Sequence, residues 1–339
     1  MSQRWKIRPE NSNWGEFGAD DQIGRLNLLT PEVRVSAAKE IHTGEAFCLS
    51  LPLDLPGGTD LNPMRQPPVR HAATRKQGMP SVNYPLRLEN DRYIDCSCDD
   101  SITLFTQYST QWDALSHVGQ YFDAVGDGEE RPTYYNGYRG GVDILAPNDE
   151  QPAIAKRLGI EKMAETSVQG RGVLVDLYAH FGEKRTLVNL EMLKQVLAAD
   201  NVTVEQGDML CLHTGFAQKL VDMGGTPDPE VLHNSCAVLD GRDEALQQWI
   251  ADSGISVLIA DNFAVEAYPY KNGSVAPCEG LPLHQTCLFR LGIHLGELWY
   301  LTPLANWLRD NGRYRFFLTC PPLRLPGSFG SPVTPVATV

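Results

Sequence analysis

Short apolar runs alternate with helix-spaced apolar positions through the second half of the chain. Runs rich in β-branched residues and bounded by glycine or polar residues predict buried strands, while apolar positions at helical spacing predict amphipathic helices. Because strands and helices alternate along the chain, the pattern indicates an α/β fold. The predicted strands cover residues 171–177, 208–214, 257–261 and 314–320, and the predicted helices cover residues 187–200 and 244–253.

The first part of the chain shows little periodicity. Residues 51–93 are rich in Pro, Gly, Asn and Arg, which predicts long irregular connections, and such connections often have a function. We expect this segment to form a lid or an oligomerisation arm. No internal repeat or low-complexity tract marks a boundary. The prediction is therefore one domain over residues 1–339, with an irregular N-terminal region at 1–95 and an extended, Pro-rich tail at 321–339 that lies over the surface.

Charge and composition narrow the range of partners. The chain has 42 acidic and 29 basic residues and a formal net charge of −13, so we expect no nucleic-acid partner. No apolar run approaches the ~18 residues of a membrane span, and the N-terminus has no apolar signal region, so we expect no membrane partner and a cytoplasmic location. The eight cysteines lack Cys-x-x-Cys spacing and are predicted to be free thiols.

The densest cluster of polar and aromatic residues covers residues 107–119. Within it Asp113 and His117 are four residues apart, so their side chains are neighbours on a helix and also project to the same side of a strand. A carboxylate beside an imidazole orients the ring and raises its basicity, which suits a general base or a metal site.

A second cluster, at residues 281–298, contains His284, Gly292-Ile293 and Glu297. With it the chain resembles the cyclase family that includes kynurenine formamidase and isatin hydrolase. The signature of that family is His-x-Gly-Thr-His-x-Asp-x-Pro-x-His, followed far downstream by a His, a Gly-Ile pair and a Glu. The segments 172–176 and 207–215 fit as well. The resemblance implies a swivelling β/α fold with a mixed sheet in a single domain.

The first signature falls on residues 107–117 and departs from the family pattern. Thr110, Asp113 and His117 match, whereas Gln107 and Gln111 replace the two histidines that hold one metal ion in metal-dependent members. Amide oxygens are poorer partners than imidazole for zinc, although harder ions tolerate carbonyl oxygens better. The resemblance therefore implies that this metal position is eroded. Ser109 and Leu115 replace the Gly and the Pro of the signature.

The resemblance also implies a second metal position, used by two-metal members of the family. Asp113, His284 and Glu297 would hold a divalent metal, manganese or zinc, with one extra residue between the last two relative to the shorter family spacing. One imidazole and two carboxylates leave coordination positions open for water and substrate. We expect any metal to bind here rather than on the side of Gln107 and Gln111.

The remaining site residues take roles around that centre. His117 corresponds to the catalytic His, a proton shuttle, and acts with Asp113 and Thr110 as the predicted catalytic set. Hydrogen bonds to a developing oxyanion would come from Thr110 or the two glutamines. The predicted substrate-binding residues are Gln107, Gln111, Trp112, Tyr108 and His213, the first four within an aromatic-rich region and the last at the end of a predicted strand.

The first functional hypothesis is a hydrolase that opens a C–N amide or imide bond, or a lactone, in a small cyclic or aromatic substrate, as an arylformamidase or cyclic amidase does. A metal-free lyase, dehydratase or isomerase on the same scaffold is the alternative, because loss of two ligands could mark a change from water activation to proton transfer. A small-molecule binding protein without catalysis is a third reading. We also expect a homo-oligomer, a dimer or a tetramer.

Overall fold

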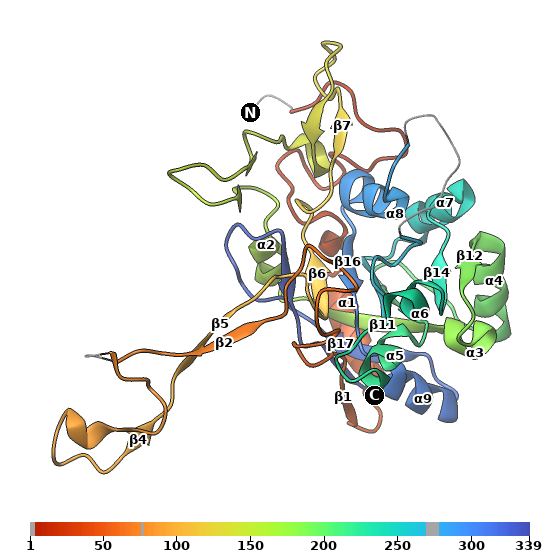
Figure 1. Cartoon of the computed structure of the whole chain (residues 1–339). Coiled ribbons are helices and arrows are strands. Elements are labelled where there is room, and N and C mark those ends of the chain that lie inside the picture. Colours follow the sequence, from red (N-terminus) through yellow and green to blue (C-terminus); the bar gives the residue numbers. More distant parts are fainter. Residues whose placement is uncertain (1–3, 76–77, 269–277) are drawn as a thin grey trace.

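A nine-stranded mixed sheet forms the centre of the molecule (Figure 1). The structure is a computed structural model, and it describes residues 4–75, 78–268 and 278–339. In the order in which they lie side by side, the strands are β1 (Ala46–Cys48), β19 (Val336–Thr338), β17 (Arg315–Thr319), β11 (Gln169–Asp176), β13 (Met209–His213), β15 (Val257–Ala260), β16 (His294–Glu297), β6 (Gln111–Asp113) and β18 (Gly330–Pro332).

The middle of the sheet is parallel and its margins are antiparallel. Strands β11, β13, β15 and β16 run in the same direction, whereas β17 and β6 pair antiparallel with the two ends of this group. The four strands predicted from the sequence correspond to β11, β13, β15 and β17. The structure therefore confirms the α/β fold with a mixed sheet, within ±2 residues at each strand end.

Each face of the sheet has its own hydrophobic core. Along β11, Val173 and Val175 belong to one core and Leu174 to the other, as the two-residue period of a strand requires. Helices α4 (Leu190–Ala199) and α7 (Glu244–Ser253) cover the first face with buried leucine, valine and isoleucine. On the second face, α9 (Thr302–Asp310) buries Leu304 and Leu308, and α1 (Pro31–Ala37) contacts β11.

Both helices predicted from the sequence are present. The bounds of α7 agree with the prediction, whereas α4 begins three residues later, because Asn189 caps it by accepting a hydrogen bond from the backbone of Met192. The other helical segments are η1 (Gly24–Leu28), η2 (Ala38–Glu40), η4 (Leu86–Leu88), η5 (Tyr135–Gly137), α2 (Ile160–Glu165), α3 (Leu177–Phe181), α5 (Phe216–Asp222), α6 (Pro229–His233), α8 (Pro282–His284) and η6 (Gln285–Leu291).

In the described part of the chain, five short two-stranded ribbons lie outside the main sheet. They are β2 (Val69–Ala72) with β5 (Asp100–Thr103), β3 (Tyr84–Pro85) with β4 (Cys96–Ser97), β7 (Gln120–Phe122) with β8 (Arg131–Thr133), β9 (Ile144–Leu145) with β10 (Ile154–Ala155), and β12 (Thr186–Val188) with β14 (Ala237–Leu239). Among the described residues, no helix is both long enough and apolar enough to cross a bilayer.

The prediction that the tail at residues 321–339 lies over the surface is wrong. Strand β19 lies between β1 and β17, and β18 pairs with β6 at the other end of the sheet. The tail thus supplies the edge strand at one margin and the second strand at the other, which a Pro-rich composition does not reveal because edge strands tolerate proline. The N-terminal region at 1–95 is not wholly irregular either, since it supplies α1 and β1.

Residues 66–75 and 78–105 form an arm that projects from the body of the molecule (Figure 1, orange). Its stem is the ribbon of β2 and β5, in which Val69 pairs with Thr103 and Ala72 with Asp100. All eight stem residues are exposed. The irregular segment predicted at residues 51–93 therefore includes a projecting element rather than only surface loops.

The position of the tail can be tested with two neighbouring residues of β19. Ala337 is fully buried and Val336 is 37% exposed. We expect Ala337→Asp to lower the free energy of unfolding by about 3–5 kcal/mol, because it places an unpaired charge in the core, and Val336→Asp to change it much less. Chemical denaturation measures both. Equal stability of the two variants would contradict a tail built into the sheet.

Candidate active site and metal centre

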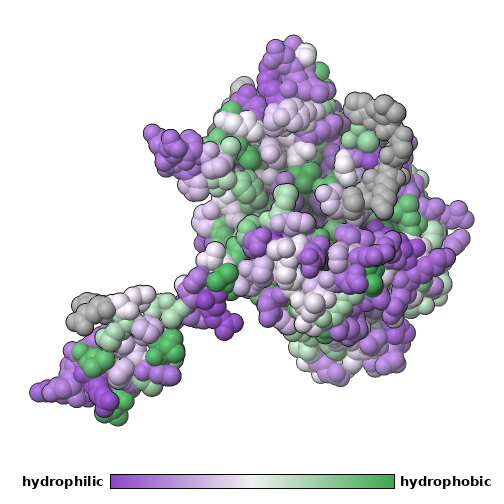
Figure 2. Space-filling model, in the orientation of Figure 1, coloured by the Kyte–Doolittle hydropathy of each residue, from purple (hydrophilic) through white to green (hydrophobic). Residues whose placement is uncertain are grey.

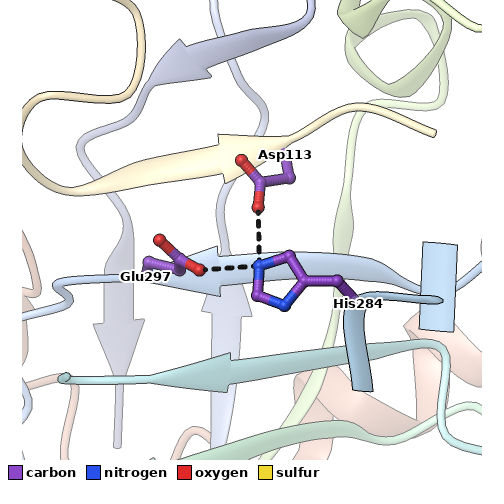
Figure 3. Close-up of side chains that lie close together, drawn as sticks. All are labelled: Asp113, His284 and Glu297. Carbon is purple, nitrogen blue, oxygen red and sulfur yellow. Dashed lines mark hydrogen bonds and ion pairs between the residues drawn. The ribbon is translucent and has the colours of Figure 1, made fainter. Parts of the chain in front are cut away.

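Two carboxylate side chains and one imidazole meet at the carboxyl end of the parallel strands. Asp113 comes from β6, Glu297 from the end of β16 and His284 from α8 (Figure 3). His284 Nε2 lies 3.2 Å from Glu297 Oε1 and 3.8 Å from Asp113 Oδ2. Their ligand atoms all lie within 4.8 Å of one another, and all three residues are buried. The carboxyl end of a parallel sheet is the usual place for a ligand site in an α/β protein.

The strand geometry decides which side chains reach this centre. Glu297 pairs with Gln111 and Gly296 with Trp112 in the antiparallel ladder of β16 and β6. Alternation along β6 then sends Gln111 and Asp113 to one face and Trp112 to the other. The fully buried Trp112 lies in the opposite core, where it packs on Trp299 at 5.1 Å between ring centroids.

Burial and pairing shift the pKa values of the three groups. Burial raises the pKa of Asp113. Burial alone would lower the pKa of His284, but hydrogen bonds with Glu266 and Glu297 raise it to about 10. Burial would likewise raise the pKa of Glu297, yet the hydrogen bond with His284 lowers it. The centre therefore holds excess negative charge that a cation, either a proton on His284 or a metal ion, stabilises.

Glu266 orients His284 and was not found by sequence reasoning. Its Oε1 lies 2.8 Å from His284 Nδ1 and accepts the backbone N–H of His284, while Oε2 accepts the backbone N–H of Leu283. Because the carboxylate fixes Nδ1, the ring presents Nε2 to Asp113 and Glu297. This carboxylate–histidine arrangement is typical of residues that support a metal ligand.

An unusual turn brings Glu266 to this position. Ala264 and Val265 precede it with φ values of 72° and 58°, in the left-handed region that residues other than glycine rarely occupy. Leu298, directly after Glu297, also has a positive φ of 56°. Such conformations concentrate at functional sites, where surrounding contacts impose them. The only sequence signal is a lone acid after a predicted strand, which is too common to identify it.

The two glutamines that replace histidines contact the carboxylates through their amide nitrogens. Gln111 Nε2 donates to Glu297 Oε2 at 2.9 Å, and Gln107 Nε2 donates to Asp113 Oδ1 at 3.1 Å. An ionised carboxylate only accepts hydrogen bonds, so the amide groups must face it with N–H. The glutamines therefore satisfy the outer carboxylate oxygens instead of acting as metal ligands or free oxyanion donors.

His117 lies beside the centre at its more open side. Its side chain is 24% exposed, and its Nε2 lies 3.8 Å from Asp113 Oδ1. The second hydrogen of the Gln107 amide points at His117 Nδ1, 2.8 Å away, so Nδ1 carries the lone pair and Nε2 the proton. Burial lowers the pKa of His117 more than Asp113 raises it. This corrects the prediction that Asp113 makes this imidazole more basic, and it keeps the ring neutral.

The segment between His284 and Glu297 contains a π-helix, η6, over Gln285–Leu291. A π-helix hydrogen-bonds from i to i+5 and so holds one more residue per turn than an α-helix, and π-turns are frequent at functional sites. This wider turn lies directly after His284, in the segment that leads to Glu297.

The residues of the centre fit a divalent metal ion. Asp113 Oδ2 is buried and makes no hydrogen bond to any residue that the structure describes. Two ligands about 2.1 Å from a tetrahedral ion lie roughly 3.4 Å apart, close to the 3.2 and 3.8 Å separations of His284 Nε2 from its two carboxylates. The donor set of one imidazole and two carboxylates suits zinc or manganese.

Two other predicted site residues, Thr110 and His213, have structural contacts away from the centre. Thr110 is buried and bridges two segments, accepting the N–H of Leu51 and donating to the carbonyl of Leu298. His213 does not join the centre, because Asp176 and Thr302 occupy its two ring nitrogens at 2.8 and 3.0 Å.

Tyr108, by contrast, lines a small cavity of about 20 Å³. The cavity is bounded by Leu298, Phe263, Tyr108 and Arg65 among others. Arg65 also donates to the carbonyl oxygen of Gln107. Sequence reasoning missed Arg65, which carries no motif and lies in an irregular stretch.

Comparison with known proteins assigns the fold to a family. The sequence model described as "Putative cyclase" matches residues 41–267. The chain belongs to this cyclase family. A solved structure described as a novel cyclase is 32% identical, with a TM-score of 0.76 over 97% of this chain and 99% of the other. No curated protein matches the chain.

Isatin hydrolases share the fold of this cyclase-family protein at much lower identity. The isatin hydrolase A of Ralstonia solanacearum is 12% identical, with a TM-score of 0.55, covering 91% of this chain and 95% of that one. The corresponding enzyme of Labrenzia aggregata, solved with benzyl benzoate, is 13% identical, with a TM-score of 0.54 and coverage of 93% and 98%. These likenesses agree with the swivelling β/α fold that the motifs imply.

The role of Glu266 can be tested through metal affinity. We expect Glu266→Gln to weaken Mn²⁺ or Zn²⁺ binding by about 10- to 100-fold, because a neutral amide offers one acceptor oxygen and no charge to hold His284. Competition with a chelator of known affinity measures the change. Glu244→Gln, at an exposed acid in the first turn of α7, is the control. Unchanged affinity in the Glu266 variant would contradict the role proposed for this carboxylate.

Proposed function

We propose that this cyclase-family protein is a metal-dependent hydrolase that opens an amide or imide bond, or a lactone, in a small cyclic or aromatic substrate. The observation that carries the proposal is the buried oxygen of Asp113, which no described residue satisfies, beside His284 and Glu297. Isatin hydrolases, whose name specifies hydrolysis of a cyclic amide, have the same fold. The 32% identical neighbour is described only as a cyclase.

In this proposal Asp113, His284 and Glu297 hold the metal. When bound, the ion would polarise the carbonyl of the substrate and lower the pKa of water. Glu266 keeps His284 turned toward the ion through Nδ1. Gln107 and Gln111 fix the two carboxylates by donating to their outer oxygens, which leaves Asp113 Oδ2 and Glu297 Oε1 on the inner side.

His117 moves the proton. Burial lowers its pKa, so the ring is neutral and able to accept a proton from the attacking water. Gln107 selects the tautomer by donating to Nδ1, and this hydrogen bond has to be given up when Nδ1 takes the proton. The protonated ring then supplies a proton to the leaving nitrogen or oxygen.

In this proposal one edge of the substrate lies at the small cavity beside Leu298, whose volume of about 20 Å³ means that its lining side chains have to move to admit a whole ring. Phe263 and Leu298 give it an apolar wall, while Tyr108 and Arg65 add an aromatic ring and a guanidinium group. Such side chains suit contact with the edge of a flat ring. Arg65 would also bind the carboxylate that hydrolysis produces.

One observation favours the metal-free alternative. His284 lies between Glu266 and Glu297, and its pKa of about 10 keeps it protonated at neutral pH when no metal competes. A protonated His284 would neutralise the centre by itself, and His117 could then serve proton transfer in a lyase, dehydratase or isomerase.

Metal analysis separates the two candidates. We expect the purified protein to contain Mn²⁺ or Zn²⁺, and chelation to abolish hydrolysis of formamides, cyclic imides or lactones until metal is restored. Asp113→Asn should lose the metal, because a neutral amide replaces the anionic ligand, whereas Gln111→Met should retain it. Elemental analysis and rates before and after chelation are the measurements. Full hydrolytic activity of metal-free protein would exclude the metal-dependent mechanism.

Replacement of the acid/base residue gives a second test. We expect His117→Asn to preserve the fold and to reduce turnover by about 10²- to 10⁴-fold, the usual contribution of a positioned proton-transfer group. His42→Asn, at an exposed histidine distant in sequence from the site, is the control and should retain activity. A His117→Asn protein with normal folding and near-wild-type turnover would contradict the mechanism.

A further inference from the structure

The C-terminal end of η6 is capped by the N-terminal segment of the chain. The last carbonyl groups of a helix have no partner within that helix. Here the carbonyls of residues 289–292, at the end of η6 and at its C-cap, all accept hydrogen bonds from residues 13–25 (Figure 1, red). The donors are the backbone N–H of Asn13, its side-chain amide, the indole N–H of Trp14 and the backbone N–H of Arg25, which reach Arg290, Leu291, Phe289 and Gly292 at 3.2, 2.9, 2.7 and 2.8 Å, respectively.

The two segments also touch backbone to backbone. Gly24 and Gly292 have φ values of 55° and 60°, and a Cβ atom at Gly24 would lie 2.1 Å from the carbonyl oxygen of Gly292. Only glycine permits this conformation and this approach together. Next to this contact, the buried guanidinium of Arg25 donates to the carbonyl oxygens of Ile250 and Ala251 near the end of α7. The N-terminal segment is therefore docked in one position against both helices.

Trp14 is the residue of this segment that reaches both sides of the candidate site. It is 1% exposed, and its ring packs edge-to-face on Phe289 of η6 at 5.2 Å and on Phe122 of β7 at 6.0 Å between centroids. Phe122 lies five residues after His117. Figure 2 shows a mostly hydrophilic surface over the tip of the ribbon of β7 and β8, so the apolar contacts of this region lie inside. One ring thus links the segment of the acid/base histidine to η6.

The capped carbonyls lie between two of the proposed metal ligands. Helix η6 begins directly after His284, and residues 289–292 lead from it to Glu297 at the end of β16. A π-helix is rare and short, so its path depends on partners outside the helix. His284 Nε2 and Glu297 Oε1 lie 3.2 Å apart, and a shift of the connection between them changes that distance. The N-terminal donors therefore act on the geometry of the centre without touching it.

We propose that Trp14 is a positioning residue for His284. By donating to the end of η6 and packing against Phe122, it sets where the His284 ring lies relative to Glu297 and His117. The inference rests on the proposed function for the consequence, which is metal binding and catalysis, whereas the position of the His284 ring is measured in metal-free protein.

Trp14→Phe provides the test, because it keeps an aromatic ring and removes the indole N–H. A buried carbonyl left without its donor favours local opening, so we expect hydrogen–deuterium exchange of residues 285–297 to become about 10-fold faster in metal-free protein. The nitrogen NMR signals of the His284 ring should shift. Mn²⁺ affinity, measured by chelator competition, should fall by about 10-fold, and kcat should fall with little change in KM. The circular dichroism spectrum should not change.

Trp5→Phe is the matched control. Trp5 belongs to the same segment, is 4% exposed and packs edge-to-face on Trp14 at 5.8 Å. Its indole makes no hydrogen bond to η6 in the part of the chain that the structure describes. We expect this variant to keep the wild-type exchange rates, His284 signals and metal affinity.

The outcomes separate this proposal from the proposed function. Unchanged His284 signals in a folded Trp14→Phe protein would overturn the positioning role, even with faster exchange in η6, and so would equal effects in the Trp5 variant. A wild-type protein that binds no metal would refute the proposed function, while the His284 signals still decide the role of Trp14.

A second variant covers the case in which Trp14→Phe does not fold. Asn13→Ala removes the side-chain donor to the carbonyl of Leu291, and the same shifts of the His284 signals and of exchange are expected. Its control is Ser12→Ala, because the Ser12 hydroxyl makes no hydrogen bond to any described residue. Wild-type His284 signals in the Asn13 variant would then overturn the proposal.

Discussion

Three carboxylates buried around one imidazole are the constraint on which the site depends. Asp113, Glu297 and Glu266 are all fully or nearly fully buried, and His284 is the one described side chain that all three approach. Burying unpaired charge is costly, so such a cluster persists only with compensating cations and hydrogen bonds. A proton on His284, or a divalent cation in its place, would provide part of this compensation, and the amide groups of Gln107 and Gln111 provide more by donating to the carboxylates.

The fold fixes the positions of these four side chains relative to one another. Strands β16 and β6 fix Glu297 and Asp113 in register, and β18 from the C-terminal tail holds β6 on its other side. His284 is placed by α8 and η6, and Glu266 by a turn with two consecutive positive φ values. The centre therefore combines β6, the segment at residues 266–297 and the C-terminal tail, and these parts have to fold together before any ligand can bind.

The projecting arm leaves the body of the molecule next to the candidate site. Arg65 and Gln107 border the arm at its two ends, and Arg65 donates to the carbonyl of Gln107. The Gln107 side chain in turn contacts Asp113 and His117. The arm therefore begins and ends next to the candidate site. Gln107, at one end of the arm, also contacts His117.

The sequence by itself determined the α/β class, the buried strands at 171–177, 208–214 and 257–261, and the helix at 244–253, because hydrophobic periodicity is a local property. Family-like motifs also selected Asp113, His117, His284 and Glu297, four residues that the structure brings together. Only the tertiary structure decided the role of the tail and the contacts of Thr110, Trp112 and His213. It also decided that Glu266 contacts His284 and that Arg65 contacts Gln107. It also showed that burial, and not the neighbouring Asp113, dominates the pKa of His117. These properties arise from contacts between residues far apart in the chain, and local patterns carry no information about burial or about which distant side chain becomes a partner.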